Sequence, residues 1–441
     1  MKHVIKKLKK CNMERFICKL SSSDSFKKEG YSEVGLWDSN MFRYTLWKKN
    51  KRQLLTIPHF FQDEALDLFY ISLMVFYVDC QVRRNDSPDR WTRSFMIEMP
   101  VLKKAKWDAN KQLLEKALDF LTGDHWTFSF RDRPYYIEGE ANYKKNLWHY
   151  RKSRVINDTD TFCMLSGGLD SFIGAINLLK EGVRPVFVGN YNGGKGVSVY
   201  QNKVIASLTT HFLYDRRNIF QFYASPMRSK ENTTRSRSFM FFSHAILLAS
   251  GMGHQVNLCI PENGVISLNI PLTIHRAGSL STRTTHPYYL GLLQTIMDNL
   301  GIQVKMYNPF QLKTKGEMIL ECKDWEFLKE NLKWTMSCSH PDLGRWKGES
   351  ASNHCGVCLP CTIRRAAVYK AKINDDTIYR DANYQDEEAS INLKSYRLGL
   401  AQHCNSYFAI QKNGPIYANK EAFADLYKRG RLELFEFLKT I

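Results

Sequence analysis

The stretch TFCMLSGGLDSFIGAINLLK (residues 161–180) decides the fold, because it presents a short apolar strand, a polar turn and a helix in succession. The same alternation continues along the chain. Strands are predicted at 161–165, 184–190, 218–225, 254–261 and 302–309, and helices at 172–181, 200–213, 237–251 and 288–300. This pattern predicts an α/β fold, a Rossmann-like parallel sheet covered by helices on both faces.

The turn SGGLDS (166–171) has the composition of an anion-binding loop. Ligands of open parallel sheets bind beyond the carboxyl ends of the strands, and this turn lies at such an end. Gly167 and Gly168 allow successive backbone N–H groups to face one concavity, and the next helix adds the positive end of its dipole. Ser166 and Ser171 can donate to phosphate oxygens. A plain turn capped by serine or aspartate is the alternative interpretation.

Asp170 is the unexpected member of this turn. A carboxylate repels a polyphosphate unless a divalent cation lies between them, so the residue predicts Mg²⁺. The arrangement G-x-x-x-x-G-K-[ST] is absent from the sequence, which excludes the ordinary P-loop as a match.

Four cysteines late in the chain have the spacing of a metal site. Cys338 precedes two overlapping C-x-x-C steps formed by Cys355, Cys358 and Cys361. Four thiolates can form a closed structural zinc site. An iron–sulfur cluster is the alternative, but the bacterial ferredoxin pattern requires a cysteine at 365, where Arg365 stands.

Composition limits the class of protein. The chain has 441 residues and 44% hydrophobic content, which is enough for two or three domains. Its longest apolar stretches fall short of the roughly 20 residues that a bilayer span requires. The odd count of 11 cysteines and the metal-like spacing of four of them predict a reducing, cytoplasmic location. The net charge of +19 favours an anionic partner, which can be nucleotide, nucleic acid or acidic protein.

Four regions follow from these patterns. An α+β domain is predicted over 1–150, with strands at 42–49, 91–99 and 125–133 and helices at 63–79 and 107–123. The sheet domain spans 151–335 and the zinc segment 336–370. Helical patterns then occupy 371–441, with Gly430 as a break in the last helix.

The turn SGGLDS resembles the pyrophosphate loop of the PP-loop ATP pyrophosphatases. Together with the cysteine pattern and the IRR that follows it (363–365), it resembles the 7-cyano-7-deazaguanine synthase (QueC) family. Residues 155–370 carry this resemblance. It implies an ATP-dependent ligase that adenylates a carboxylate, releases pyrophosphate and forms a C–N bond.

Three further segments carry the resemblance. NYNGGKGVSVYQ (190–201) is loosely similar to the family segment after the second strand. RSRSFMFFSHA (235–245) is similar to a helix start of the family, with Ser238 in place of the usual asparagine, and implies a role for Arg237. NPFQLKTKGEMI (308–319) is similar to a segment that implies Lys315 near the nucleotide's phosphates.

The segment PENGVISLNIPLTIHRAGSLSTRTTHPYYL (261–290) is longer than its counterpart in the family. Asn263 and Gly264 predict a hairpin turn. The segment starts where a ligand would lie, so its polar residues are substrate-binding candidates: Glu262, Asn263, Arg276, Arg283 and His286. An arginine there can hold a carboxylate or phosphate. His286 can act as a base or can be structural.

The longer segment and the added N-terminal region resemble the QueC-like QatC proteins of bacterial anti-phage defence. That resemblance implies a 7-deazaguanine acid as substrate, and we hypothesise that the amine is the N-terminus of a partner protein from the same operon. The alternatives are a 7-cyano-7-deazaguanine synthase that uses ammonia, a tRNA-modifying sulfur transferase and a non-catalytic scaffold.

Overall fold

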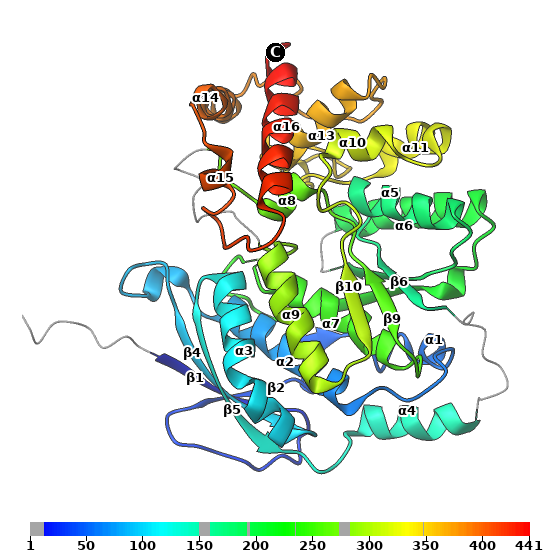
Figure 1. The fold of residues 1–441 in the computed structure, drawn as a ribbon. Coiled ribbons are helices and arrows are strands. Elements are labelled where there is room, and N and C mark those ends of the chain that lie inside the picture. Colours follow the sequence, from blue (N-terminus) through cyan, green and yellow to red (C-terminus); the bar gives the residue numbers. More distant parts are fainter. Residues whose placement is uncertain (1–12, 150–158, 192–194, 234, 273–282, 347) are drawn as a thin grey trace, which may run out of the picture.

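The computed structural model describes residues 13–149, 159–191, 195–233, 235–272, 283–346 and 348–441 (Figure 1). Two sheets organise these residues. The larger has the strand order β10-β9-β6-β7-β8-β3 and consists of β3 (Phe42–Tyr44), β6 (Thr161–Met164), β7 (Val186–Tyr191), β8 (Ile219–Pro226), β9 (Val256–Cys259) and β10 (Val304–Tyr307). All its strands are parallel except the edge strand β3. The predicted α/β fold with a parallel sheet is therefore confirmed.

The strand order contains a switch point between β6 and β9. From β6 the chain proceeds to β7 and β8 on one side, and then returns to place β9 and β10 on the other. At such a point the two neighbouring connections leave the sheet in opposite directions and open a crevice at the carboxyl edge. The loops after β6 and β9 border this crevice.

The N-terminal region is also built on a parallel sheet. Its order is β2-β1-β4-β5, with β1 (Met13–Lys19), β2 (Ser32–Gly35), β4 (Ser94–Val101) and β5 (His125–Asp132). Every pairing in it is parallel, so the predicted α+β class is wrong for this region. Alternating polarity suggested half-buried strands but carried no information on strand direction. The predicted strand 42–49 is confined to β3, which pairs with β8 of the other sheet.

Helices fill the space between the sheets and cover the far face of the larger one. Between the sheets lie α2 (Asp63–Gln81), α3 (Lys104–Thr122), α7 (Arg237–Ser250) and α9 (Pro287–Leu300), which share one hydrophobic core with strands of both sheets. A second core joins the six-stranded sheet to α5 (Leu169–Lys180), α6 (Lys195–His211), α10 (Lys315–Leu320) and α11 (Trp325–Asn331). Two further helices in the first half of the chain are α1 (Lys51–Leu54) and α4 (Glu138–His149).

The C-terminal helices, orange and red in Figure 1, gather beyond the carboxyl edge of the six-stranded sheet. They are α12 (Leu343–Trp346), α13 (Leu359–Lys370), α14 (Glu387–Ala401), α15 (Ser406–Ala409) and α16 (Lys420–Leu438). The predicted break at Gly430 is wrong, because α16 continues through it. Gly430 instead allows close approach, since a Cβ there would lie 2.5 Å from a methyl carbon of Val265. Among the described residues, no helix is both long and apolar enough to cross a membrane.

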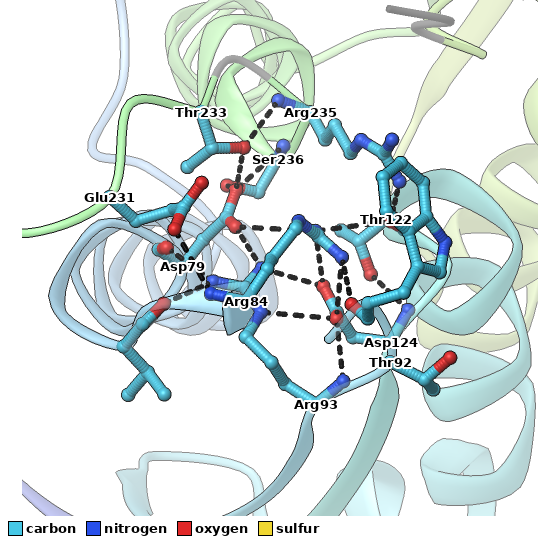
Figure 2. A network of polar contacts seen from close by, with 12 residues as sticks. Asp79, Arg84, Thr92, Arg93, Thr122, Asp124, Glu231, Thr233, Arg235 and Ser236 are labelled. Carbon is cyan, nitrogen blue, oxygen red and sulfur yellow. Dashed lines mark hydrogen bonds and ion pairs between the residues drawn. The ribbon is translucent and has the colours of Figure 1, made fainter. Parts of the chain in front are cut away.

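A buried ionic network joins α2, the start of β4, the α3–β5 turn and the segment before α7 (Figure 2). The Arg93 guanidinium lies 2.5 Å from an Asp79 carboxylate oxygen and 2.7 Å from one of Asp124. Arg84 lies 2.7 Å from Asp124, and the Ser236 hydroxyl donates to Asp79 over 2.6 Å. Because the side chains of both aspartates are fully buried, each arginine depends on them for its counter-charge.

Replacing Asp124 with alanine is expected to lower the free energy of unfolding by about 3–5 kcal/mol, because Arg84 and Arg93 would share only Asp79. Guanidinium chloride denaturation measures this loss. Asp108→Ala, which removes a half-exposed ion pair with Lys104, is the matched control and should cost about 0.5 kcal/mol or less. Equal effects of the two substitutions would contradict the assigned role of the network.

Candidate functional site

The loop SGGLDS follows β6 at the switch point and leads directly into α5. Gly167 has a φ of +85°, and a Cβ there would lie 2.8 Å from the Gln201 Cα, so both the backbone conformation and the close approach require glycine. The Gly167 carbonyl accepts a 2.9 Å hydrogen bond from the Met336 N–H. The loop is therefore held between α6 and the segment that leads to the cysteine cluster.

Polar groups of the loop form hydrogen bonds with one another. The Ser166 N–H donates to the Ser171 hydroxyl over 3.2 Å, and the Gly168 N–H donates to the Ser166 hydroxyl over 3.2 Å. The two hydroxyl oxygens are 3.0 Å apart. These are the donors that the sequence predicted for phosphate, and a bound anion would have to replace the internal acceptors.

Asp170 lies at the centre of a polar cluster formed by three loops. One carboxylate oxygen accepts from the Asn263 side-chain amide over 2.7 Å and from its backbone N–H over 3.1 Å. The other oxygen accepts from the Lys315 ammonium, and both partners of this ion pair are buried. Asn263 follows β9 and Lys315 follows β10, so residues separated by 145 positions meet beside the crevice.

Glu262 completes this cluster, with one carboxylate oxygen 3.4 Å from the Asn263 side-chain amide nitrogen. Burial and the neighbouring Asp170 charge raise the pKa of Glu262 well above its usual value. Burial alone would raise the pKa of Asp170 as well, but the Lys315 charge and a hydrogen bond from Glu262 outweigh it and lower that pKa to about 2. The cluster therefore holds a protonated Glu262 beside an ionised Asp170, a pairing that acid–base chemistry can use.

We expect Glu262→Gln to raise the melting temperature increasingly as the pH rises above about 4.5. The raised pKa means that the folded state retains a proton that the unfolded state releases. The free energy of unfolding of the unsubstituted protein therefore falls as the pH rises through this range. Glutamine cannot ionise and avoids that loss. Differential scanning calorimetry from about pH 4 to pH 8 measures the effect. A melting-temperature difference that stays constant with pH would contradict the raised pKa.

Neighbouring elements fix the positions of these side chains. Asn263 caps α8 (Gly264–Leu268) by accepting from the Ile266 N–H, so the predicted hairpin at Asn263–Gly264 is wrong. An Asn-Gly pair suits either a turn or a helix start, and the close packing of Gly264 on the Gln311 carbonyl selects the helix. The side-chain oxygen of Asn308 accepts a hydrogen bond from the Glu262 N–H, and its side-chain nitrogen donates to the Glu262 carbonyl.

Nothing in the sequence pointed to Glu433 or to its contacts with the start of α10. Glu433 accepts from the Thr314 hydroxyl over 2.7 Å and from the Gly316 N–H over 3.0 Å. The last helix of the chain thus holds the start of α10, where Lys315 lies. Gln201 was signalled only as part of a segment loosely similar to the QueC family. Its side chain donates to the Leu165 carbonyl beneath the loop over 2.8 Å.

Three other predicted site residues make contacts elsewhere. Arg283 donates to the Phe120 carbonyl over 2.7 Å and to Asn413, which ties α3 to the C-terminal region. His286 is fully buried, caps α9 and packs on Phe120, and burial lowers its pKa to about 4. Arg237 begins α7 beside the ionic network, with its guanidinium 5.5 Å from the Phe241 ring. Arg276 lies outside the described residues.

The four predicted metal ligands converge. The sulfur atoms of Cys338, Cys355, Cys358 and Cys361 all lie within 4.8 Å of one another. The Cys338–Cys358 and Cys355–Cys361 sulfur distances are 4.0 and 3.9 Å, close to the roughly 3.8 Å edge of a tetrahedron with 2.3 Å zinc–sulfur bonds.

Backbone groups support this arrangement of sulfurs. The N–H groups of His340 and Cys355 donate to the Cys338 sulfur, and that of Cys358 donates to the Cys355 sulfur, each over 3.3 Å. Such donors stabilise thiolates. Gly356, with a φ of +88°, forms the turn between Cys355 and Cys358. The donor set and the spacing fit zinc.

The chain matches no family model, no curated protein and no solved structure.

Proposed function

We propose that this protein is an ATP-dependent ligase of the PP-loop type, which activates a carboxylic acid by adenylation and joins it to an amine. The observation that carries the proposal is the cluster of Asp170, Glu262, Asn263 and Lys315 at the switch point, beside a glycine- and serine-rich loop that opens a helix. This is where an open parallel sheet places its ligand, and the loop has the donors for a phosphate group.

The proposed reaction has two steps. A carboxylate oxygen of the substrate attacks the α-phosphorus of ATP, and the bond to the bridging oxygen breaks, so that pyrophosphate leaves. The amine nitrogen then attacks the carbonyl carbon of the acyl adenylate, AMP leaves and the nitrogen loses a proton. Loop N–H groups and Lys315 would stabilise the charge that develops on the departing pyrophosphate. Glu262 and Asp170 can accept or return the proton.

Magnesium at Asp170 stays a prediction. Both oxygens of this carboxylate already accept from Asn263 and Lys315, so direct coordination requires Lys315 to leave. The four cysteines would hold zinc as a structural ion that fixes the segment after α11.

The substrate proposal rests on the resemblance to the QueC and QatC proteins. It assigns a 7-deazaguanine carboxylate as the acid and the N-terminus of a partner protein as the amine. Ammonia as the amine is the closest alternative. It would first yield the primary amide, and a second ATP would have to adenylate the amide oxygen so that AMP leaves with that oxygen and the nitrile forms. A sulfur transferase is less well supported, because it needs an exposed thiol of low pKa. Of the described cysteines outside the cluster, all but Cys404 are buried, and burial raises the pKa of Cys80 to about 12.

Pyrophosphate release from ATP in the presence of 7-carboxy-7-deazaguanine tests the first step. We expect release by the native protein and little by Asp170→Asn, which keeps the shape of the side chain but removes its charge. Release no higher than background from both proteins would overturn the enzyme proposal and favour a scaffold. Intact-mass measurement of the operon partner after incubation tests the second step. If the partner mass is unchanged and the nitrile product forms, ammonia and not the partner's N-terminus is the amine substrate.

A further inference from the structure

A polar hollow of about 360 Å³ lies between the N-terminal region and the six-stranded sheet, away from the cysteine cluster. Its volume is in the range of small-molecule sites. The residues that define its chemistry are Lys49, Asn50, Tyr191, Asn202, Arg216 and Gln221. They come from the chain before α1, the end of β7, helix α6 and the start of β8, so this hollow exists only because the two halves of the chain meet.

The hollow forms where β8 is only partly covered by the short edge strand β3. The strand β3 pairs with Ala224, Ser225 and Pro226 alone. Side chains replace a strand farther back along β8: the Asn50 amide donates to the Gln221 carbonyl over 3.2 Å, and Gln53 donates to the Ile219 carbonyl over 2.9 Å. Space that another strand would fill is left open beside them.

Asn50, one of the residues that line the hollow, carries a buried acceptor without a donor. Because the Asn50 amide nitrogen donates to a carbonyl, the orientation of this amide is fixed. Its oxygen is buried, in a residue only 7% exposed, and has no hydrogen-bond partner among the described residues. A buried carbonyl oxygen without a donor is costly, so the occupant of the hollow should donate a hydroxyl or amino hydrogen here.

The rim of the hollow is cationic. Lys49 donates to the Tyr191 hydroxyl over 3.3 Å, and Arg216 donates to the Ile219 carbonyl and to Gln221. The described residues that line the hollow include no carboxylate, and neither cation forms an ion pair within the described part of the chain. Two positive charges without counter-ions favour an anionic group, and a guanidinium suits phosphate in particular.

We propose that this hollow binds a phosphate ester that carries hydroxyl or amino donors, of the size of a nucleoside monophosphate. The phosphate would lie between Lys49 and Arg216, a donor group would reach the Asn50 oxygen, and a planar base would lie against Tyr191. The site is separate from the loop SGGLDS, because the Gln201 side chain lies between them: Gln221 donates to Gln201, which donates to the Leu165 carbonyl. The proposal does not depend on the ligase reaction.

Isothermal titration of the full chain with GMP, guanosine and ribose 5-phosphate tests the site. We expect GMP to bind at least about tenfold more tightly than guanosine, and the double variant Lys49→Gln/Arg216→Gln to weaken GMP binding about tenfold or more. The matched control is Lys48→Gln/Arg217→Gln, which removes the same charge from neighbouring positions and should leave the affinity unchanged. Both pairs are exposed, so all variants should fold.

Each other outcome counts against the proposal. If GMP and guanosine bind with equal affinity, the phosphate makes no contact in the hollow and the proposal is wrong. Ribose 5-phosphate that binds as tightly as GMP would confirm the sugar-phosphate contacts and overturn the place assigned to the base. GMP binding that is weakened by Asp170→Asn, but not by the Lys49/Arg216 variant, would locate the nucleotide at the loop after β6 and overturn the second site. Absence of binding at millimolar GMP would overturn it as well.

Discussion

Lys315→Ala is expected to reduce pyrophosphate release from ATP by about 100- to 1000-fold. Lys315 is the buried cation of the switch-point cluster, and its ammonium binds Asp170 next to the loop that would hold the departing pyrophosphate. A fixed cation in a site screened from water stabilises developing phosphate charge far more than a solvated one. Single-turnover measurements with saturating ATP would report the effect on the chemical step.

Lys313→Ala is the matched control for this substitution. Lys313 lies two residues earlier and pairs with Glu321, but both side chains are at least one-third exposed. Its removal should change pyrophosphate release by less than about twofold. Melting temperatures measured in parallel separate a catalytic loss from unfolding. A Lys315→Ala protein that is folded and fully active would exclude this residue from the reaction.

Removal of zinc is expected to unfold the segment around the four cysteines while the sheets stay folded. Structural zinc contributes about 10–16 kcal/mol of binding free energy in small zinc-dependent folds. The native protein should therefore contain about one zinc per chain. Cys361→Ser, which removes a fully buried ligand, should lose the metal and expose the neighbouring chain to protease. Metal analysis by mass spectrometry and limited proteolysis measure the two effects.

Cys322→Ser is the control for zinc loss, because Cys322 is buried outside the cluster and should leave the zinc content unchanged. Zinc loss should also weaken pyrophosphate release, since the Met336 N–H binds the Gly167 carbonyl only two residues before Cys338. If metal analysis finds iron and sulfide instead of zinc, the four cysteines hold an iron–sulfur cluster. If the native protein contains no metal and the cysteine segment still resists protease, a structural ion is excluded.

Local pattern was enough to predict the five parallel strands of the six-stranded sheet. Each of its five parallel strands and the four helices around them falls within a few residues of its predicted range, because the alternation of apolar strands and helices is written in neighbouring residues. The N-terminal region was assigned to the wrong class because strand direction depends on connections through α2 and α3. The extent of β3 was missed for a similar reason, since it pairs with β8, some 180 residues later.

The candidate site shows the same division. Residue type and spacing identified the loop at 166–171 and the four cysteines, because glycine conformations and sulfur ligands are local chemical requirements. Position in the sequence predicted that Arg276, Arg283 and His286 lie with Glu262 beside the ligand, and substrate binding by these residues stays a prediction. Arg283 and His286 pack on Phe120, and burial of the imidazole is a property of that contact.

The amino-acid sequence by itself determined the parallel strands of the larger sheet and the four cysteines that cluster as candidate metal ligands, since each depends on residues close together in the chain. It also predicted the loop suited to phosphate. Only the tertiary structure decided that Asp170, Glu262 and Lys315 form one buried cluster and that Glu433 supports it from the last helix. Ionisation and hydrogen bonding depend on which groups are buried side by side, and the topology of the sheet, rather than the spacing of residues, sets those neighbours.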